Sequence, residues 1–332
     1  MQLRADEPQP LLQASAIHVR FRLSGGRELR ALGGINVCVD PGEIVGIVGE
    51  SGCGKSTLAR ALVGLVPLQS GEIRWRGRGV DFADMQALRA LRREVQMVFQ
   101  DPFSSLDPRL TIRASVLEPL ISARPDLSRA AQQDVARHWL IRVGLDESFL
   151  SRYPHELSGG QCQRVAIARA AIVQPSLLIC DEAVSALDVS VQGQILQLLR
   201  TLQFELQMAV VFISHHLVVV SQLAQRVLVL YLGRIVESGP AARVLHRPLH
   251  PYTRALIDAV PVPDPLIERA RSRATLQGEL PSPIDPPSGC VFRTRCPHAI
   301  AVCAERVPQE EEGTEGHRVA CHRWREGLTG HS

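Results

Sequence analysis

The sequence has no apolar stretch approaching the roughly 18 residues that a membrane-spanning helix needs. Its most hydrophobic segment, 208–220, is interrupted by one serine and two histidines. The N-terminus carries Asp6, Glu7 and two prolines where a signal peptide would have its apolar core. We therefore expect a cytoplasmic protein that does not itself span a membrane.

A strong excess of charge is also missing. The 37 Lys and Arg residues nearly balance the 34 Asp and Glu residues, for a net charge of +3. This balance offers no basic surface for nucleic acid. Hydrophobic residues make up 45% of the chain and charged residues 21%, which excludes a disordered chain and allows a large core. The 332 residues indicate about two domains.

Proline is sparse in the body of the chain and frequent near its end. Twelve of the 22 prolines lie in the last 93 residues, after Gly239. Four of the eight cysteines cluster in the same segment, and the other four are scattered, at Cys38, Cys53, Cys162 and Cys180. Without an export signal, thiols are expected. These patterns predict a compact body followed by a Pro- and Cys-rich appendage.

The body alternates between strand and helix patterns. Strands are expected at Glu43–Val48, Glu72–Trp75, Val95–Phe99, Leu177–Cys180, Ala209–Ile213 and Arg226–Tyr231. Helical patterns at Lys55–Val63 and Gln192–Leu206 lie between them, which predicts an α/β core with a mostly parallel sheet. The Ala- and Leu-rich stretch 111–150 predicts a helical insertion. Ala16–Leu23 and Ile35–Val39 predict a small antiparallel sheet.

A glycine-rich loop follows the apolar strand Ile44–Val48 and precedes a helical segment. It reads Gly49-Glu50-Ser51-Gly52-Cys53-Gly54-Lys55-Ser56-Thr57, which is the P-loop spacing in its strand–loop–helix context. Glycines allow backbone N–H groups to face phosphates, and the helix N-terminus adds positive potential. Lys55 is predicted to reach the β- and γ-phosphates of ATP, and Ser56 to bind Mg²⁺. The alternative, an ordinary Gly-rich turn, is disfavoured by this context.

Two acids end another apolar strand, in Leu177-Leu178-Ile179-Cys180-Asp181-Glu182. Because side chains alternate along a strand, these acids are expected on different sides. We predict that Asp181 holds Mg²⁺ and that Glu182 polarises the attacking water as general base. Two solvated acids are the alternative, which the P-loop upstream disfavours.

A third motif, Leu157-Ser158-Gly159-Gly160-Gln161, precedes the helical run Cys162–Ile172. With the P-loop before it and the Asp-Glu strand after it, the sequence resembles an ATP-binding-cassette (ABC) ATPase. A helix N-terminus is itself an anion site. The resemblance implies that Ser158, Gly159, Gly160 and Gln161 contact the γ-phosphate bound to a second subunit, in a head-to-tail dimer around two ATP molecules.

Further elements of this family lie at matching places. Gln100 matches the Q-loop glutamine, which senses Mg²⁺ and water, and His215 matches the switch histidine near the γ-phosphate. Ser185-Ala186-Leu187-Asp188 matches the D-loop. Phe21 is the candidate for the aromatic residue that stacks on adenine, with a plain strand residue as the alternative. The catalytic set implied is thus Glu182, His215, Lys55 and Gln100, and the Mg²⁺ ligands implied are Ser56, Gln100 and Asp181.

Three positions depart from the family pattern. Cys162 follows the signature where Arg is usual, Ala183 follows Asp-Glu where Pro is common, and His216 replaces the Asp after the switch histidine. None of the three removes a predicted phosphate ligand, metal ligand or base. The change at His216 affects the expected geometry of the switch.

The appendage narrows the resemblance. His250-Pro251-Tyr252 matches the His-Pro-Tyr motif of dipeptide and oligopeptide importer ATPases, and Gly278–Pro283, Pro286–Cys290 and Arg295-Cys296-Pro297 continue the similarity. It covers nearly the whole chain, from about Leu11 to Trp324, and is closest to the second ATPase (F-type) subunit. Residues 11–239 would form the ABC domain, with a helical and signature subdomain at about 101–172. Residues 240–332 would form the C-terminal extension.

The resemblance implies an ATPase that couples ATP hydrolysis to the uptake of dipeptides and oligopeptides. The implied partners are a second ATPase subunit, either a sister chain or a second copy, two transmembrane permeases and an extracytoplasmic solute-binding protein. The chain would be peripheral, at the cytoplasmic face of the cell membrane. Nickel or another small solute is the alternative cargo. One alternative function is that of a soluble ABC ATPase that takes no part in transport. Another is that the tail serves as a redox module and the ATPase activity is secondary.

The clustered cysteines follow the order Cys290-x5-Cys296-x6-Cys303-x17-Cys321, which is not the paired C-x-x-C spacing of common zinc ribbons. Four thiolates can hold a [4Fe–4S] cluster or a tetrahedral zinc ion. The resemblance to peptide-importer ATPases implies a structural iron–sulfur cluster. Four free thiols are the alternative.

Overall fold

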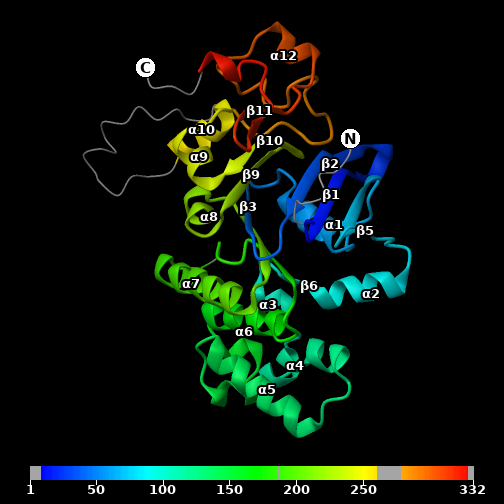
Figure 1. Cartoon of the computed structure of the whole chain (residues 1–332), viewed down its shortest axis with the longest axis vertical. Coiled ribbons are helices and arrows are strands. Elements are labelled where there is room, and N and C mark those ends of the chain that lie inside the picture. Colours follow the sequence, from blue (N-terminus) through cyan, green and yellow to red (C-terminus); the bar gives the residue numbers. More distant parts are fainter. Residues whose placement is uncertain (1–8, 186, 260–277, 328–332) are drawn as a thin grey trace, which may run out of the picture. The chain divides into compact units, whose positions relative to one another are not determined.

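The computed structural model describes residues 9–185, 187–259 and 278–327. The chain divides into two compact units, each assembled from segments far apart in the sequence (Figure 1). Unit 1 comprises Met1–Leu11, Val39–Glu43 and Trp75–Ile213. Unit 2 comprises Leu12–Cys38, Ile44–Arg74 and Ser214–Ser332.

Unit 1 is built on parallel strands. The parallel set comprises β6 (Val95–Val98), β7 (Leu177–Asp181) and β8 (Ala209–Ser214), and the short strand β5 (Arg78–Gly79) does not belong to it. β7 lies between β6 and β8, parallel to both. Every residue of β7 and β8 is buried, as expected for strands covered on both faces. The parallel register places Asp181 opposite Ile213, at the edge where both strands end.

Helices make up most of the rest of unit 1. They are α2 (Met85–Glu94), α3 (Pro102–Ser105), α4 (Ile112–Ala123), α5 (Arg129–Arg142), η2 (Glu147–Ser151), η3 (Pro154–Glu156), α6 (Gly159–Ala171) and α7 (Val189–Leu206). Side-chain oxygens of Thr111, Ser128 and Ser158 cap α4, α5 and α6, which fixes where these helices begin. The three helices contact one another and lie side by side (Figure 1). The helical insertion predicted at 111–150 corresponds to α4, α5 and η2.

Unit 2 contains two sets of strands. They are β1 (Leu12–Arg22), β2 (Glu28–Val39), β3 (Ile44–Val48), β4 (Ser70–Trp75), β9 (Arg226–Tyr231), β10 (Arg234–Pro240), β11 (Glu311–Thr314) and β12 (His317–Val319). In one sheet the order is β2-β1-β4. Residues 23–27 join β1 to β2, a connection too short for a parallel crossover, so this pair is antiparallel as predicted.

The other set of strands in unit 2 joins the body to the C-terminal segment. Its order is β11-β12-β10-β9-β3, with β3 parallel to β9 and the remaining neighbours antiparallel. The helices of the unit are η1 (Ser24–Gly26), α1 (Lys55–Leu62), α8 (Leu217–Leu223), α9 (Ala241–His246), α10 (Pro251–Asp258), α12 (Ala301–Glu305) and η4 (Trp324–Glu326). α9 packs on β10 and α10 on α8, so the C-terminal segment shares the core of unit 2.

The prediction of an α/β fold with parallel and antiparallel strands is confirmed, and the six strands predicted for the body are all present. They differ from the predicted ranges by only a few residues. Among the described residues, every helix is too short or too polar to span a membrane.

Candidate functional site

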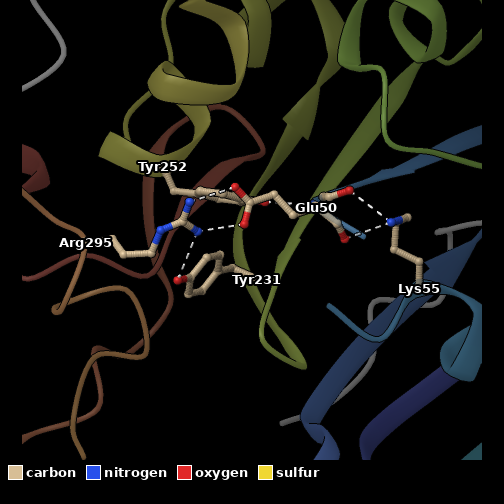
Figure 2. A network of polar contacts seen from close by, with 6 residues as sticks. Glu50, Lys55, Tyr231, Tyr252 and Arg295 are labelled. Atoms are coloured by element: carbon tan, nitrogen blue, oxygen red, sulfur yellow. Dashed lines mark hydrogen bonds and ion pairs between the residues drawn. The ribbon is translucent and has the colours of Figure 1, made fainter. Parts of the chain in front are cut away.

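The P-loop of unit 2 lies between β3 and α1 and is closed around Lys55. The Lys55 side chain is buried, and its Nζ donates hydrogen bonds to the carbonyl oxygens of Gly49 (2.9 Å) and Glu50 (3.0 Å) (Figure 2). Gly54 begins the helix at φ +109°, and a Cβ there would lie 2.7 Å from the Ala31 carbonyl oxygen. Only glycine fits this turn. The loop thus has the strand–loop–helix geometry of a phosphate site, with one buried cation.

The rest of the predicted loop residues differ in exposure. Ser51 and Gly52 are exposed, whereas Ser56 and Thr57 are half-buried in the first turn of α1. Cys53 is 1% exposed, and burial raises the pKa of its thiol to about 11 despite the nearby Lys55. The thiol is therefore neutral at pH 7 and adds no negative charge beside Lys55.

Glu50 of the P-loop is held by residues from the C-terminal segment. The Arg295 guanidinium donates to both carboxylate oxygens of Glu50, at 2.7 and 3.0 Å. The backbone N–H of Glu50 donates to the Tyr252 hydroxyl at 2.9 Å. Figure 2 shows Arg295 and Tyr252 approaching the loop beside Tyr231. The P-loop and the C-terminal segment therefore share a polar network inside unit 2.

The acidic end of β7 lies in unit 1. Asp181 is 1% exposed and Glu182 is 9% exposed. The Gln100 side-chain amide donates to a Glu182 carboxylate oxygen at 3.0 Å, so the structure brings these two predicted residues together. The Glu182 N–H donates to the carbonyl oxygen of Ile213 at 3.0 Å.

Glu182 also has an unusual backbone. Its φ is +49°, in the left-handed region of the backbone that residues other than glycine rarely adopt. The Ser185 hydroxyl and N–H both donate to the Glu182 carbonyl oxygen, at 2.9 and 3.1 Å, and hold this turn. Strained residues of this kind cluster at functional sites, which supports the prediction made from the sequence.

The signature motif forms the N-terminus of α6. The Ser158 hydroxyl accepts from the Gln161 N–H at 3.4 Å, and the Gln161 side chain accepts from the Ser158 N–H at 2.9 Å. This capping box occupies both side chains and leaves the first turn of the helix to face an anion through its backbone. A Cβ on Gly159 would lie 3.8 Å from Leu187 of the D-loop, so signature and D-loop are neighbours.

The D-loop prediction is only partly described. Asp188 is the N-cap residue of α7, and Ala186 lies outside the described residues.

The other predicted nucleotide residues belong to unit 2. His215 follows β8 and is exposed, with its ring centroid 4.0 Å from that of His216. Phe21 lies on β1 and is 37% exposed. Lys55, Ser56, Phe21 and His215 are thus in one unit, and Gln100, Asp181, Glu182 and the signature in the other. The roles of these residues toward ATP and Mg²⁺ stay predictions.

Two departures from the family pattern are buried. Cys162 is fully buried, with its sulfur 3.4 Å from the Pro154 carbonyl oxygen, and burial raises the pKa of the thiol to about 11. Ala183 is 2% exposed. Both side chains serve packing in unit 1.

The four C-terminal cysteines lie near one another, but their arrangement does not supply the ligand geometry of a metal site. Burial raises the pKa of Cys290 to about 11, and the thiols of Cys303, Cys321 and Cys296 add to this shift. The Cys290 N–H donates to the Cys303 carbonyl oxygen at 2.8 Å. However, in the described part of the chain no group of three or more His, Cys, Asp or Glu side chains is arranged to hold a metal ion. The prediction of an iron–sulfur cluster is therefore not supported.

Sequence reasoning missed the contacts of Arg295 and Tyr231. Both residues lie near motifs or strands singled out in the sequence, and Arg295 is in the Arg-Cys-Pro segment. Arg295 donates to Glu50, which is 245 residues away, and to the Tyr231 hydroxyl, which is 64 residues away, and at such separations spacing carries no signal.

Comparisons with known proteins agree with the motifs. A family model described as "ABC transporter" matches residues 32–185, and one described as "Oligopeptide/dipeptide transporter, C-terminal region" matches residues 236–303. The oligopeptide transport ATP-binding protein OppF of Salmonella typhimurium is 48% identical over 95% of this chain and 97% of its own length. The di/tripeptide transport ATP-binding protein DppF of Pseudomonas aeruginosa is 47% identical over 91% and 93%.

A solved structure, the dimeric post-hydrolysis state of the ATP-binding cassette MJ0796 bound to ADP and Pi, is also similar. It has a TM-score of 0.65 and 31% identity, and the match covers 69% of this chain and 98% of that chain.

Proposed function

Because the chain belongs to the ABC transporter family and carries the C-terminal region of its oligopeptide/dipeptide branch, we propose that it drives the import of peptides. The chain is an ABC-type ATPase. The proposed cargo is dipeptides and oligopeptides, taken up at the expense of ATP.

One observation carries the proposal. The His-Pro-Tyr segment of the peptide-transporter region contacts the P-loop directly, because the Tyr252 hydroxyl accepts the Glu50 N–H at 2.9 Å. His250 stabilises this segment by accepting the Tyr252 N–H at 3.0 Å with its Nδ1. The region that marks the peptide branch is therefore part of the nucleotide site rather than a separate attachment.

The proposed chemistry is the one that the family motifs imply. Lys55 and His215 would stabilise charge on the γ-phosphate as it is transferred, and the signature of a second subunit would add its helix N-terminus. Glu182, oriented by Gln100, would accept a proton from the attacking water. Ser56, Gln100 and Asp181 would hold Mg²⁺, which neutralises phosphate charge when it is bound.

The assembly follows from the family. The proposed partners are a second ATPase subunit, two permeases and an extracytoplasmic binding protein, and the proposed location is the cytoplasmic face of the cell membrane. The proposed domain limits are 11–239 for the ABC domain, with its helical and signature part at about 101–172, and 240–332 for the extension.

The cysteine cluster is proposed separately as an iron–sulfur site. Its support is the mutual proximity of Cys290, Cys296, Cys303 and Cys321, expressed in the raised pKa of Cys290, and not ligand geometry. Iron and sulfide analysis after anaerobic purification tests it. A metal-free chain with a folded tail would overturn it.

The main test is solute uptake in a strain that lacks this chain. Labelled dipeptide, a longer peptide and nickel are each offered, with complementation by wild type or by Glu182→Gln. Peptide uptake restored only by wild type is the expected result. Restored nickel uptake without any peptide effect would replace the proposed cargo. No effect on any solute would favour an ABC ATPase without transport.

A further inference from the structure

The C-terminal segment grips one residue of the P-loop from two sides. Arg295 binds the Glu50 carboxylate through two nitrogens, at 2.7 and 3.0 Å. Tyr252 accepts the Glu50 backbone N–H at 2.9 Å. Arg295 and Tyr252 lie 245 and 202 residues after Glu50 in the sequence, and all three residues belong to unit 2.

This ion pair differs from the surface pairs of the chain. The Arg295 side chain is 7% exposed and the Glu50 side chain 23% exposed. A two-pronged Arg–carboxylate pair holds direction as well as charge, and burial protects it from screening by salt. Exposed pairs such as Arg109–Asp107, with 86% and 35% exposure, contribute little by comparison.

An aromatic cluster supports these contacts, and Figure 2 shows two of its members, Tyr231 and Tyr252. The Tyr231 ring lies 4.6 Å from the Tyr252 ring and 5.2 Å from the Phe292 ring, and all three side chains are fully buried. The Arg295 guanidinium lies 5.9 Å from the Tyr231 ring centroid and 3.5 Å from its hydroxyl. Close-packed aromatic edges restrict how Arg295 can move.

The charge of Glu50 explains why the grip matters for nucleotide. Glu50 sits inside the loop that wraps phosphate groups, and its carbonyl oxygen accepts a hydrogen bond from Lys55 Nζ at 3.0 Å. An uncompensated carboxylate at this place would repel a triphosphate. Arg295 cancels that charge while Tyr252 fixes the backbone on which the loop depends.

We propose that Arg295 and Tyr252 are positioning residues of the P-loop, through which the C-terminal extension sets the affinity for Mg·ATP. The inference rests on the proposed function only in taking this loop as the ATP site. The competing explanation is that the pair merely fastens the extension to the body.

The decisive experiment compares Mg·ATP binding by the purified full chain and four variants, using a fluorescent ATP analogue with Mg²⁺. Arg295→Ala is expected to weaken binding about tenfold, because it leaves the Glu50 carboxylate uncompensated. Glu50→Gln is expected to weaken binding by about threefold, less than Arg295→Ala, because it removes the repelling charge while its amide oxygen can still accept from Arg295. The double variant, which carries both Arg295→Ala and Glu50→Gln, is expected to bind Mg·ATP with an affinity in the same range as Glu50→Gln. Arg293→Ala is the matched control and should not change affinity, because the Arg293 guanidinium donates to the carbonyl and hydroxyl oxygens of Ser288 in the C-terminal segment.

Rescue distinguishes the two explanations. If the ion pair only attaches the extension to the body, both single variants should lose thermal stability while their affinity for Mg·ATP stays that of wild type. The double variant should then regain none of the lost thermal stability. That pattern, or an Arg295→Ala variant that binds Mg·ATP like wild type, would overturn the inference. Because wild-type binding and peptide uptake are measured independently, such a result would leave the proposed function standing.

A second pair of variants covers the case in which Arg295→Ala does not fold. Tyr252→Phe keeps the buried ring but removes the acceptor of the Glu50 N–H, and is expected to weaken Mg·ATP binding about threefold, the effect of losing one net hydrogen bond. Tyr231→Phe is its control, because it also removes a buried tyrosine hydroxyl, but one that accepts from Arg295 at 3.5 Å, whereas the Tyr252 hydroxyl accepts from the Glu50 N–H. Equal affinity in both variants would overturn the role of Tyr252.

Discussion

The P-loop after β3 and the acidic corner after β7 are both strand ends, but they are held in different ways. At β7, Glu182 is held by Gln100 and by the Ile213 carbonyl oxygen, all within unit 1. At β3, Glu50 is held by Arg295 and Tyr252, which come from the C-terminal segment of unit 2. The acidic corner after β7 is held by residues of its own unit, and the P-loop is held by residues of the C-terminal extension.

Because the two strand ends are held by different parts of the chain, substitutions at each of them should have different effects. A change at the β7 corner should alter turnover while ATP still binds. A change in the extension should alter the nucleotide affinity or the stability of unit 2 while the chemistry at Glu182 stays intact. The following predictions test that separation.

The largest effect is expected at Glu182. Glu182→Gln keeps the side-chain shape and the contact with Gln100 but cannot accept a proton, so turnover should fall by about 10²- to 10⁴-fold while Mg·ATP still binds. Phosphate release by the assembled transporter and Mg·ATP binding by the purified chain measure the two quantities. Glu118→Gln, an exposed carboxylate of unit 1 bonded to Arg169, is the control. Wild-type turnover in Glu182→Gln would remove Glu182 as the base.

The second largest effect is expected at Glu237, a buried carboxylate that binds the C-terminal extension. Glu237 accepts the N–H groups of Leu249 and His250, at 2.7 and 2.9 Å, and lies 2.7 Å from His317 Nε2. Glu237→Ala leaves these buried groups without their partner and should lower the free energy of unfolding by about 3–5 kcal/mol.

Urea unfolding measures this loss, and hydrogen exchange should locate it in unit 2 rather than at β7. Glu310→Ala is the control, because Glu310 is exposed, accepts from the Ser238 hydroxyl at 3.3 Å and forms a surface ion pair with Arg318 at 4.0 Å. Equal stability of both variants would contradict a fastening role for Glu237.

A smaller effect is expected at the signature helix. Ser158→Ala removes the side-chain cap of α6 and should lower the free energy of unfolding by about 1 kcal/mol. Ser128→Ala removes the equivalent cap of α5 and should destabilise by a similar amount. Only Ser158→Ala should also reduce ATP turnover, because α6 begins at the signature. Equal turnover in the two variants would show that Ser158 acts as a cap alone.

The smallest effect concerns pH and the P-loop thiol. Burial raises the folded-state pKa of Cys53 from 9.0 to about 11, so between these values the folded chain binds more protons than the unfolded chain. Stability should therefore fall as pH rises above about 9, by about 1 kcal/mol at pH 10. Urea unfolding at pH 7 to 10 should give a flatter pH profile for Cys53→Ala than for wild type. Parallel profiles would show that Cys53 ionises alike in both states.

Several features could be predicted from the sequence because they are local. Apolar runs marked the six strands. The P-loop spacing and the Asp-Glu ending of β7 indicated which strand ends carry polar groups, because each motif is a short run of neighbours.

Other features depended on the folded chain. The left-handed backbone of Glu182 arises from hydrogen bonds to Ile213 and Ser185, which no composition indicates. Four cysteines in one segment predicted a metal site, yet ligand geometry depends on packing, and the described residues do not supply it.

The sequence by itself determined the strands, the P-loop, the signature and the family, because these reside in short patterns and their order. Only the tertiary structure decided that Arg295 and Tyr252 reach Glu50. Their contact depends on how β9, α10 and the C-terminal loops pack around Tyr231 and Phe292. A salt bridge between residues 245 positions apart is set by that three-dimensional packing, and sequence spacing does not encode it.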